Sequence, residues 1–213
     1  MNSGLLRILV LGLVLLVAVV AMIPRRAVPP PEAATELPRV LALPDTSFTD
    51  HNGDAFTTQN LTGSFSLLFF GFTNCPDICP LSLQVLAAAN ALLLDTTSVP
   101  PPRVVLISVD PARDNPARLK DYLGNFDTKF VGITTAEENL RSWLQLLGVT
   151  VMKMPLNGQN YNMTHNAQVF VTNPDGAIIA IMSSAESPEI VARDYARIRA
   201  RYLTGTSAIS AQQ

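Results

Sequence analysis

The sequence has little cysteine, little histidine and no excess of basic residues. Its 213 residues include two cysteines, Cys75 and Cys79, and two histidines. A small scaffold held by disulfides needs more cysteines at wider spacing, so that class is excluded. Lys and Arg number 15 against 17 Asp and Glu, so the basic surface that nucleic acid requires is not expected. Hydrophobic residues make up 48% of the chain, enough for one well-buried core.

The longest hydrophobic run lies at the N-terminus. No charge interrupts Ile8 to Ile23, and the run approaches the roughly 20 residues of a spanning helix when Leu5 and Leu6 are added and Arg7 reaches the interface. We predict that residues 1–23 form a single-pass anchor in the inner membrane. A cleaved signal peptide is the alternative, although a clear A-x-A cleavage site is missing. Either interpretation places the rest of the chain in the periplasm or an equivalent compartment.

The composition divides the remaining chain into three parts. Residues 24–39 are rich in proline and lack apolar periodicity, which predicts an extended tether. A folded domain is expected over residues 40–203, and residues 204–213 are expected to form a flexible tail. The domain contains no internal repeat and no second linker.

Within the domain, predicted strands and helices alternate. Continuous apolar runs predict buried strands, and Leu/Ala-rich or amphipathic segments predict helices. Strands are expected at 65–72, 104–109, 130–133, 168–172 and 178–182, and helices at 81–94, 115–126, 137–147 and 187–202. This series is typical of an α/β domain with a mixed central sheet flanked by helices.

The segment GFTNCPDICP, residues 71–80, carries the chemistry. It lies where a buried strand ends and a helix begins, and the free amides and dipole of a helix N-terminus favour thiolate over thiol. Two thiolates select Cu(I) or Zn(II), but a structural zinc site needs four ligands and the chain has no second cysteine pair. The residues therefore favour copper, as Cu(I) or Cu(II), at Cys75 and Cys79. The spacing also permits a disulfide, so a redox role stays open.

A third copper ligand would have to come from a distant segment. His165 directly precedes a predicted strand, and in a sheet of this kind the loop entering that strand faces the cysteine loop. Imidazole suits copper, so His165 is the predicted third ligand. His51 lies in the sequence DHNGD, which predicts an exposed turn rather than a metal ligand.

Two aspartates are further polar candidates, Asp77 and Asp110. Asp110 follows a predicted strand, at the edge of the sheet where α/β sites are built, so it is a candidate to orient a ligand or partner. The alternative is that Asp110 and Asp114 cap the next helix.

Three methionines lie near His165 in the sequence. Met152, Met154 and Met163 are candidates for auxiliary soft ligands or for a soft surface that binds a partner. Ordinary packing is the commoner role of methionine, and it is the favoured interpretation here.

Three segments resemble the Sco/SenC family of copper-binding proteins. They are residues 71–80, the sequence LISVDPARDNPARLKDYL at 106–123, and His165 followed by a strand and NPDG. Together they extend over most of residues 65–202. The predicted anchor and tether agree with the same family.

The resemblance implies a thioredoxin fold and copper bound by two cysteines and a histidine, roles that fall on Cys75, Cys79 and His165. It also implies delivery of copper to the dinuclear centre of a cytochrome c oxidase subunit. The expected partners are therefore that subunit, a copper donor protein and the membrane.

Two functions fit these residues, and a third shares the fold class. The first is a copper metallochaperone without turnover. The second is a membrane-tethered thiol–disulfide oxidoreductase that reduces the cysteines of the oxidase copper site. A thiol peroxidase would need one activated cysteine with an Arg or Thr to polarise peroxide; Thr73 is available, but nothing else in the sequence supports that activity.

Overall fold

The computed structural model describes residues 4, 11–13, 27–96, 99–156, 160–185 and 187–207. The predicted anchor lies outside this part of the chain except at four positions, and so do residues 208–213 of the predicted tail. Among the described residues, one helical segment, Ile78–Asp95, is long and apolar enough to cross a membrane. This segment contributes Leu83, Leu86 and Leu93 to the core of the domain, which accounts for its composition. The N-terminal anchor stays a prediction.

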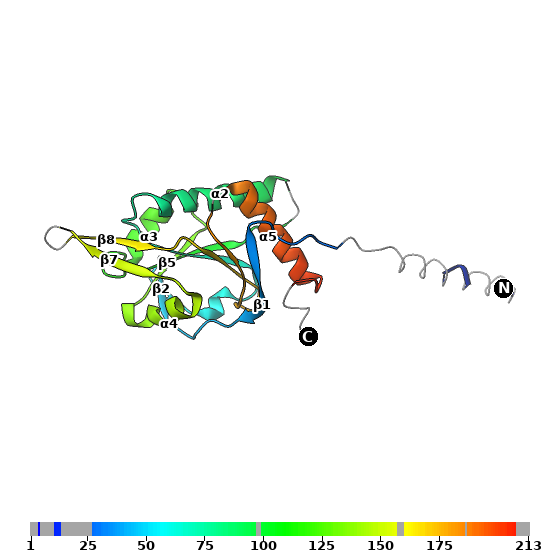
Figure 1. Cartoon of the computed structure of the whole chain (residues 1–213), viewed down its shortest axis with the longest axis horizontal. Coiled ribbons are helices and arrows are strands. Elements are labelled where there is room, and N and C mark those ends of the chain that lie inside the picture. The colour runs from blue at the N-terminus through cyan, green and yellow to red at the C-terminus, as the bar shows by residue number, and fades with distance from the viewer. Residues whose placement is uncertain are drawn as a thin grey trace.

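Eight strands form one mixed sheet. They are β1 (Ala34–Leu41), β2 (Phe48–Asp50), β3 (Ala55–Phe56), β4 (Ser66–Gly71), β5 (Arg103–Ser108), β6 (Val131–Thr134), β9 (Val169–Thr172) and β10 (Ile178–Met182). Their order across the sheet is β1-β10-β9-β4-β5-β6-β2-β3 (Figure 1). The neighbours β4, β5 and β6 are parallel, whereas β9 pairs antiparallel with β4. The predicted mixed sheet is confirmed.

Helices cover both faces of this sheet. They are α2 (Ile78–Thr96), α3 (Pro116–Leu123), α4 (Glu137–Leu147) and α5 (Pro188–Leu203), with a short 3-10 helix, η1 (Thr58–Leu61). Right-handed crossovers from β4 to β5 and from β5 to β6 place α2 and α3 on one face. The C-terminal helix α5 packs beside α2, and α4 covers the opposite face (Figure 1).

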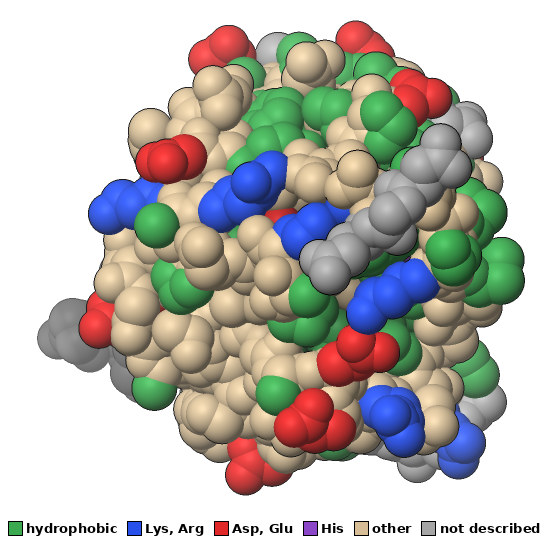
Figure 2. All heavy atoms as spheres, turned by 90° about the vertical axis from the view of Figure 1, so that its left-hand side faces the viewer, with side chains coloured by type: hydrophobic (Ala, Val, Ile, Leu, Met, Phe, Trp, Pro, Cys, Tyr) green, Lys and Arg blue, Asp and Glu red, His purple; other side chains and the backbone are tan. Residues whose placement is uncertain are grey.

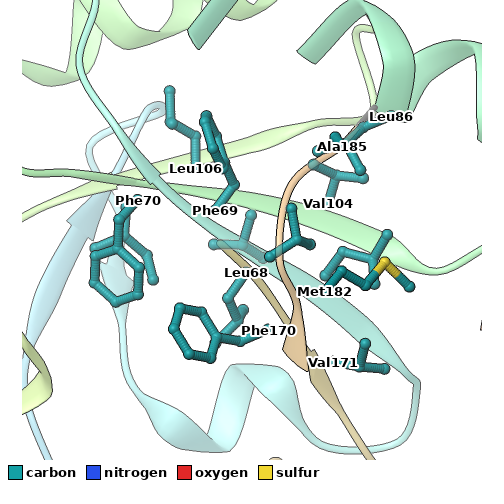
Figure 3. Packing of buried hydrophobic residues seen from close by; sticks show 14 of the residues in the cluster. Leu68, Phe69, Phe70, Leu86, Val104, Leu106, Phe170, Val171, Met182 and Ala185 are labelled. Carbon is teal, nitrogen blue, oxygen red and sulfur yellow. The ribbon is translucent and has the colours of Figure 1, made fainter. Parts of the chain in front are cut away.

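The core lies between the sheet and its helices. All six residues of β4 are buried, as expected for a central strand covered on both faces. Phe69, Phe70 and Leu106 project from neighbouring strands into this core, together with Phe170 (Figure 3). Each such side chain contributes about 1.5–3 kcal/mol by leaving water. The core thereby fixes the end of β4, from which the cysteine segment departs.

A separate hairpin projects from this body. Its strands are β7 (Val151–Pro155) and β8 (Tyr161–His165), which pair antiparallel and extend away from the main sheet (Figure 1). The hairpin was not predicted, because β7 shows no apolar alternation and four of its five residues are exposed.

The folded domain begins earlier than predicted. The expected boundary at residue 40 is corrected, because β1 starts at Ala34 and pairs with β10, with Ala34 opposite Met182. The strand lies at the edge of the sheet, where Pro38 is tolerated, and only Ala34 is fully buried. An edge strand of this composition resembles a proline-rich tether in sequence, which explains the error.

A buried carboxylate fastens the start of this strand. Asp194 of α5 accepts hydrogen bonds from the backbone amides of Glu32, at 3.0 and 3.1 Å, of Ala33, at 2.7 Å, and of Ala34, at 3.0 Å. Burial alone opposes ionisation, but these amides outweigh it and lower the pKa of Asp194 below its usual value. The ionised carboxylate therefore stabilises the folded chain.

We predict that Asp194→Asn lowers the free energy of unfolding by about 1–3 kcal/mol at neutral pH, because the amide group cannot satisfy three donors. The folded state binds the Asp194 proton less tightly than the unfolded state, whose aspartates titrate near about pH 3.9. This contribution is therefore fully present above about pH 3.9. It is lost as the pH falls from there through the lower pKa of the folded state. Chemical unfolding followed by circular dichroism from pH 7 to 3 measures both effects.

The exposed Asp45 provides the control, since Asp45→Asn should leave the unfolding curve unchanged. An Asp194→Asn protein that keeps the stability and the acid dependence of the parent would contradict this role.

Candidate metal centre

The two cysteines lie at the junction of β4 and α2. Cys75 is half-buried in the loop, and its amide donates to the Phe72 carbonyl at 3.2 Å. Cys79 is fully buried in the first turn of α2. Pro80 is the third residue of that helix, where the backbone nitrogen has no intrahelical partner, so proline is tolerated.

His165 reaches the cysteines from the hairpin. It is the last residue of β8 rather than part of a loop, and its Nε2 lies 3.1 Å from Cys79 Sγ. Its Nδ1 lies 3.0 Å from the Asn166 carbonyl, which can only accept a hydrogen bond. Nδ1 therefore carries the proton, and the lone pair of Nε2 points toward the sulfur.

Aromatic rings enclose the imidazole of His165. The Phe69 and Phe72 rings meet it edge-on, with centroid distances of 6.1 and 5.8 Å. These contacts restrict the ring orientation and shield one side of the centre from water.

The three predicted ligands converge on one point. The sulfurs of Cys75 and Cys79 and a nitrogen of His165 all lie within 4.8 Å of one another. Three atoms arranged trigonally around a single ion at about 2.3 Å lie about 4.0 Å apart. The three donor atoms are therefore close to the spacing that one shared ion requires. Two sulfurs and a neutral imidazole form a donor set suited to copper.

The two thiols differ strongly in acidity. A hydrogen bond from Cys79, together with backbone amides, outweighs partial burial and lowers the pKa of Cys75 to about 4. The Cys79 amide is one donor, 3.4 Å from Cys75 Sγ. The hydrogen-bonded neighbour Cys75 and deep burial raise the pKa of the Cys79 thiol. At neutral pH one thiolate therefore lies beside one thiol.

Gly71 provides the space that Cys79 occupies. A Cβ atom at this position would lie 3.2 Å from Cys79 Sγ and 3.0 Å from side-chain atoms of Leu106 and Phe69. Both hydrocarbon neighbours belong to the packed core and have little room to move. Glycine at the end of β4 is therefore required for the sulfur to sit this deep.

The carboxylate of Asp114 supports the start of the cysteine loop. It is buried and accepts from the Thr73 amide at 3.1 Å, the Thr73 hydroxyl at 2.6 Å and the Ser108 hydroxyl at 2.7 Å. Helix α3 is instead capped by Asn115, whose Oδ1 accepts from the Arg118 amide. The capping interpretation of Asp114 is therefore wrong.

Thr73 also contacts Arg118 of α3. Its hydroxyl accepts a hydrogen bond from Arg118 Nε at 2.6 Å while donating to Asp114. This hydroxyl supports the loop, and the geometry does not favour its use to polarise peroxide.

Asp110 does not cap α3 either. It is buried and accepts from the Tyr161 hydroxyl at 2.5 Å and from Arg113 Nε. Arg113 and Tyr161 were missed as site residues. The Asp-Pro-Ala-Arg-Asp spacing at 110–114 was a usable signal for Arg113, whereas no local pattern marks Tyr161.

Neither His51 nor Asp77 belongs to the group formed by the three donor atoms. His51 Nδ1 accepts from the Gly132 amide at 3.0 Å, which fixes its turn against β6, and its exclusion as a ligand stays a prediction. Asp77 is exposed between the cysteines, and its carbonyl accepts from the Leu81 amide.

The methionines divide between the two faces of the hairpin. Cross-strand partners share a face, and Met152 pairs with Thr164 whereas Val151 pairs with His165. Met152 and Met154 are therefore exposed on the face opposite His165. Met163 shares the face of His165 and is buried, as the packing interpretation predicts.

Comparisons with known proteins support the mixed α/β fold described above. The SCO1/SenC family model matches residues 40–200. A SCO2-like protein of Rickettsia felis is 34% identical over 157 residues, covering 68% of this chain and 71% of that protein.

Two solved structures with copper bound share the mixed α/β fold. Arabidopsis thaliana ScoI gives a TM-score of 0.70 at 28% identity, covering 75% of this chain and 98% of that one. Bradyrhizobium japonicum ScoI gives 0.65 at 31% identity, covering 74% and 99%. The chain therefore belongs to the SCO1/SenC family, and its thioredoxin-like domain is the fold of that family.

Proposed function

We propose that the protein is a copper metallochaperone that binds one copper ion through Cys75, Cys79 and His165. The observation that carries this proposal is the convergence of their donor atoms within 4.8 Å, from a loop, the helix that follows it and a hairpin more than 80 residues away in the sequence. The copper-bound relatives from Arabidopsis thaliana and Bradyrhizobium japonicum support the choice of metal.

The chain's own groups account for uptake and release. Cys75 is a thiolate at neutral pH, so it offers a ligand without first losing a proton. Cys79 holds its proton and must release it when metal binds, which couples binding to pH. Cys75 is also the less buried of the two, so an exchange partner meets it first.

The partners we propose are a copper donor and the subunit that carries the dinuclear copper centre of cytochrome c oxidase, as the family resemblance implies. Exposed apolar side chains lie beside the cysteines, with Ile78 37% and Leu81 50% accessible. The end of the molecule at which the hairpin projects presents hydrophobic side chains among basic and acidic ones (Figure 2). Such a surface suits docking of another protein.

A second function is supported by the asymmetry of the thiols. A thiolate beside a buried thiol is the arrangement of an attacking and a resolving cysteine, so the same pair can reduce a partner's disulfide. We propose that thiol–disulfide exchange on the oxidase copper site is the alternative to copper transfer.

The proposed placement is a single-pass anchor in the inner membrane, with the domain in the periplasm or an equivalent compartment. Arg201 and Arg197 of α5 donate to the carbonyls of Val28 and Pro30. The chain therefore reaches the body near α5, at the end opposite the hairpin (Figure 1). An anchor joined there leaves the hairpin end facing away from the membrane.

The anchor predicts that the full-length protein stays in the membrane fraction after washing with alkaline carbonate, because the apolar run of residues 8–23 approaches a spanning length once Leu5 and Leu6 extend it and Arg7 reaches the interface. Immunoblotting of the washed fractions is the measurement. Recovery of a soluble mature protein that begins between residues 21 and 27 would show that the segment is a cleaved signal peptide.

The ligand assignment predicts different losses for the three residues. Cys75→Ala or Cys79→Ala should abolish stable Cu(I) binding, because one thiolate and one imidazole remain. His165→Ala should weaken Cu(I) binding modestly, since Cu(I) accepts two thiolates, but should eliminate a defined Cu(II) complex, which prefers nitrogen. Competition with a Cu(I) chelator and EPR of the Cu(II) form measure both states in the full-length protein.

His51→Ala is the control and should bind copper as the parent does, because His51 contacts β6 away from the site. Oxidation to a Cys75–Cys79 disulfide should block Cu(I) uptake. If the parent protein has no copper affinity but turns over generic disulfides rapidly, the metallochaperone proposal is wrong and the oxidoreductase function is supported.

A further inference from the structure

Both segments that carry the proposed ligands rest on one short loop, residues 110–114, between β5 and α3. On one side of this loop, the Asp114 carboxylate holds Thr73 through both its amide and its hydroxyl. The Ser108 hydroxyl connects the two acidic residues, because it donates to Asp114 at 2.7 Å and accepts from the Asp110 amide at 3.1 Å. The cysteine segment is thus fixed to the loop at its first residues.

On its other side, the loop holds the hairpin through Tyr161, the first residue of β8. The Tyr161 hydroxyl donates to Asp110 at 2.5 Å, and Arg113 Nη1 donates to the Tyr161 carbonyl at 3.0 Å. The Arg113 guanidinium lies 3.8 Å from the centroid of the Tyr161 ring and pairs with the Asp110 carboxylate. We name these three residues, Asp110, Arg113 and Tyr161, the hairpin latch.

The hairpin has few other attachments to the body. In the described part of the chain it pairs with no strand of the main sheet. Met163 packs into the core, and Asn166 bonds the Thr150 amide and the Gly148 carbonyl at the base. The Lys153–Glu137 ion pair is exposed, and such pairs contribute little. The latch is therefore the main polar contact that holds the far end of β8 down.

Alternation along β8 connects the latch to the metal centre. Tyr161, Met163 and His165 are two residues apart, so their side chains share one face, and that face lies against the body. Tyr161 donates to Asp110, Met163 packs into the core, and His165 lies against Cys79.

A continuous series of contacts between planar groups reinforces this connection. The Arg113 guanidinium lies over Tyr161 and 6.0 Å from the Phe72 ring, and Phe72 meets the His165 ring at 5.8 Å. Phe72 is also the residue whose carbonyl accepts from the Cys75 amide. A displacement of Tyr161 therefore changes the packing against both ligand-bearing segments.

We propose that the 110–114 loop positions His165 against the cysteine pair, and that opening of the hairpin latch limits the release of copper. Asp110, Arg113 and Tyr161 act as positioning residues, since they touch no ligand atom. The proposal rests on the proposed function for its second half, because release requires copper at Cys75, Cys79 and His165. Its first half concerns the hairpin itself.

Tyr161→Phe tests the latch in the full-length protein, because it removes one hydroxyl and keeps the ring over Arg113. In copper-free protein, backbone amides of residues 151–154 and 161–165 should exchange with solvent about tenfold faster, since a hydrogen bond to an ionised group contributes at least that factor to an opening equilibrium. In the copper-loaded protein, transfer of Cu(I) to excess chelator should accelerate by a similar factor. The Cu(II) EPR spectrum should also change, because His165 is held less firmly.

Tyr202→Phe is the matched control. Its hydroxyl bonds Asn173 and Asp175 near the β9–β10 turn, so the same atom is lost at a distance from the hairpin. Unchanged exchange in Tyr161→Phe would overturn the positioning role, and faster exchange with parental copper release and EPR would overturn the link to copper. A parent protein that takes up no copper would refute the proposed function, while the exchange rates would still decide the positioning role.

Discussion

The metal centre depends on the deep burial of one sulfur atom, Cys79 Sγ. This atom lies against the backbone of Gly71 on one side and 3.1 Å from His165 Nε2 on the other. Its place requires a strand that ends in glycine, a helix that begins two residues before Pro80, and a hairpin that returns from more than 80 residues away. The strand and the helix are fixed by the core beneath them, and the hairpin is held by Met163 and the latch.

Burial and exchange place opposite demands on such a site. A buried thiol in a water-poor pocket favours a soft cation, whereas transfer requires that a partner reach the ligands. The chain divides these demands between its two cysteines, since Cys79 is buried and protonated and Cys75 is half-buried and ionised. Support from Asp114 keeps the loop of Cys75 in place without covering its sulfur.

Much of this architecture is predictable from local sequence. Buried strands such as 65–72 are visible as apolar runs, and the proline at position 80 places the cysteines at a helix start. The convergence of Cys75, Cys79 and His165 was also predicted, because soft ligands need a third partner and the chain has few histidines. Strand β1 was not, since an exposed edge strand with a proline carries no periodic signal.

The latch was beyond sequence reasoning for a different reason. The acidic residues Asp110 and Asp114 suit a helix N-terminus, so the sequence left their role open. What decides it is Tyr161, which lies 51 residues from Asp110 in the chain and is brought to it by folding of the hairpin. Contacts of this range depend on tertiary structure and leave no trace in local composition.

X-ray absorption at the copper edge of the anaerobically loaded full-length protein tests the central claim most directly. The account predicts two sulfur neighbours and one nitrogen neighbour around Cu(I), with the nitrogen lost in His165→Ala and kept in His51→Ala. A copper ion with fewer than two sulfur neighbours, or a nitrogen neighbour that persists in His165→Ala, would contradict it.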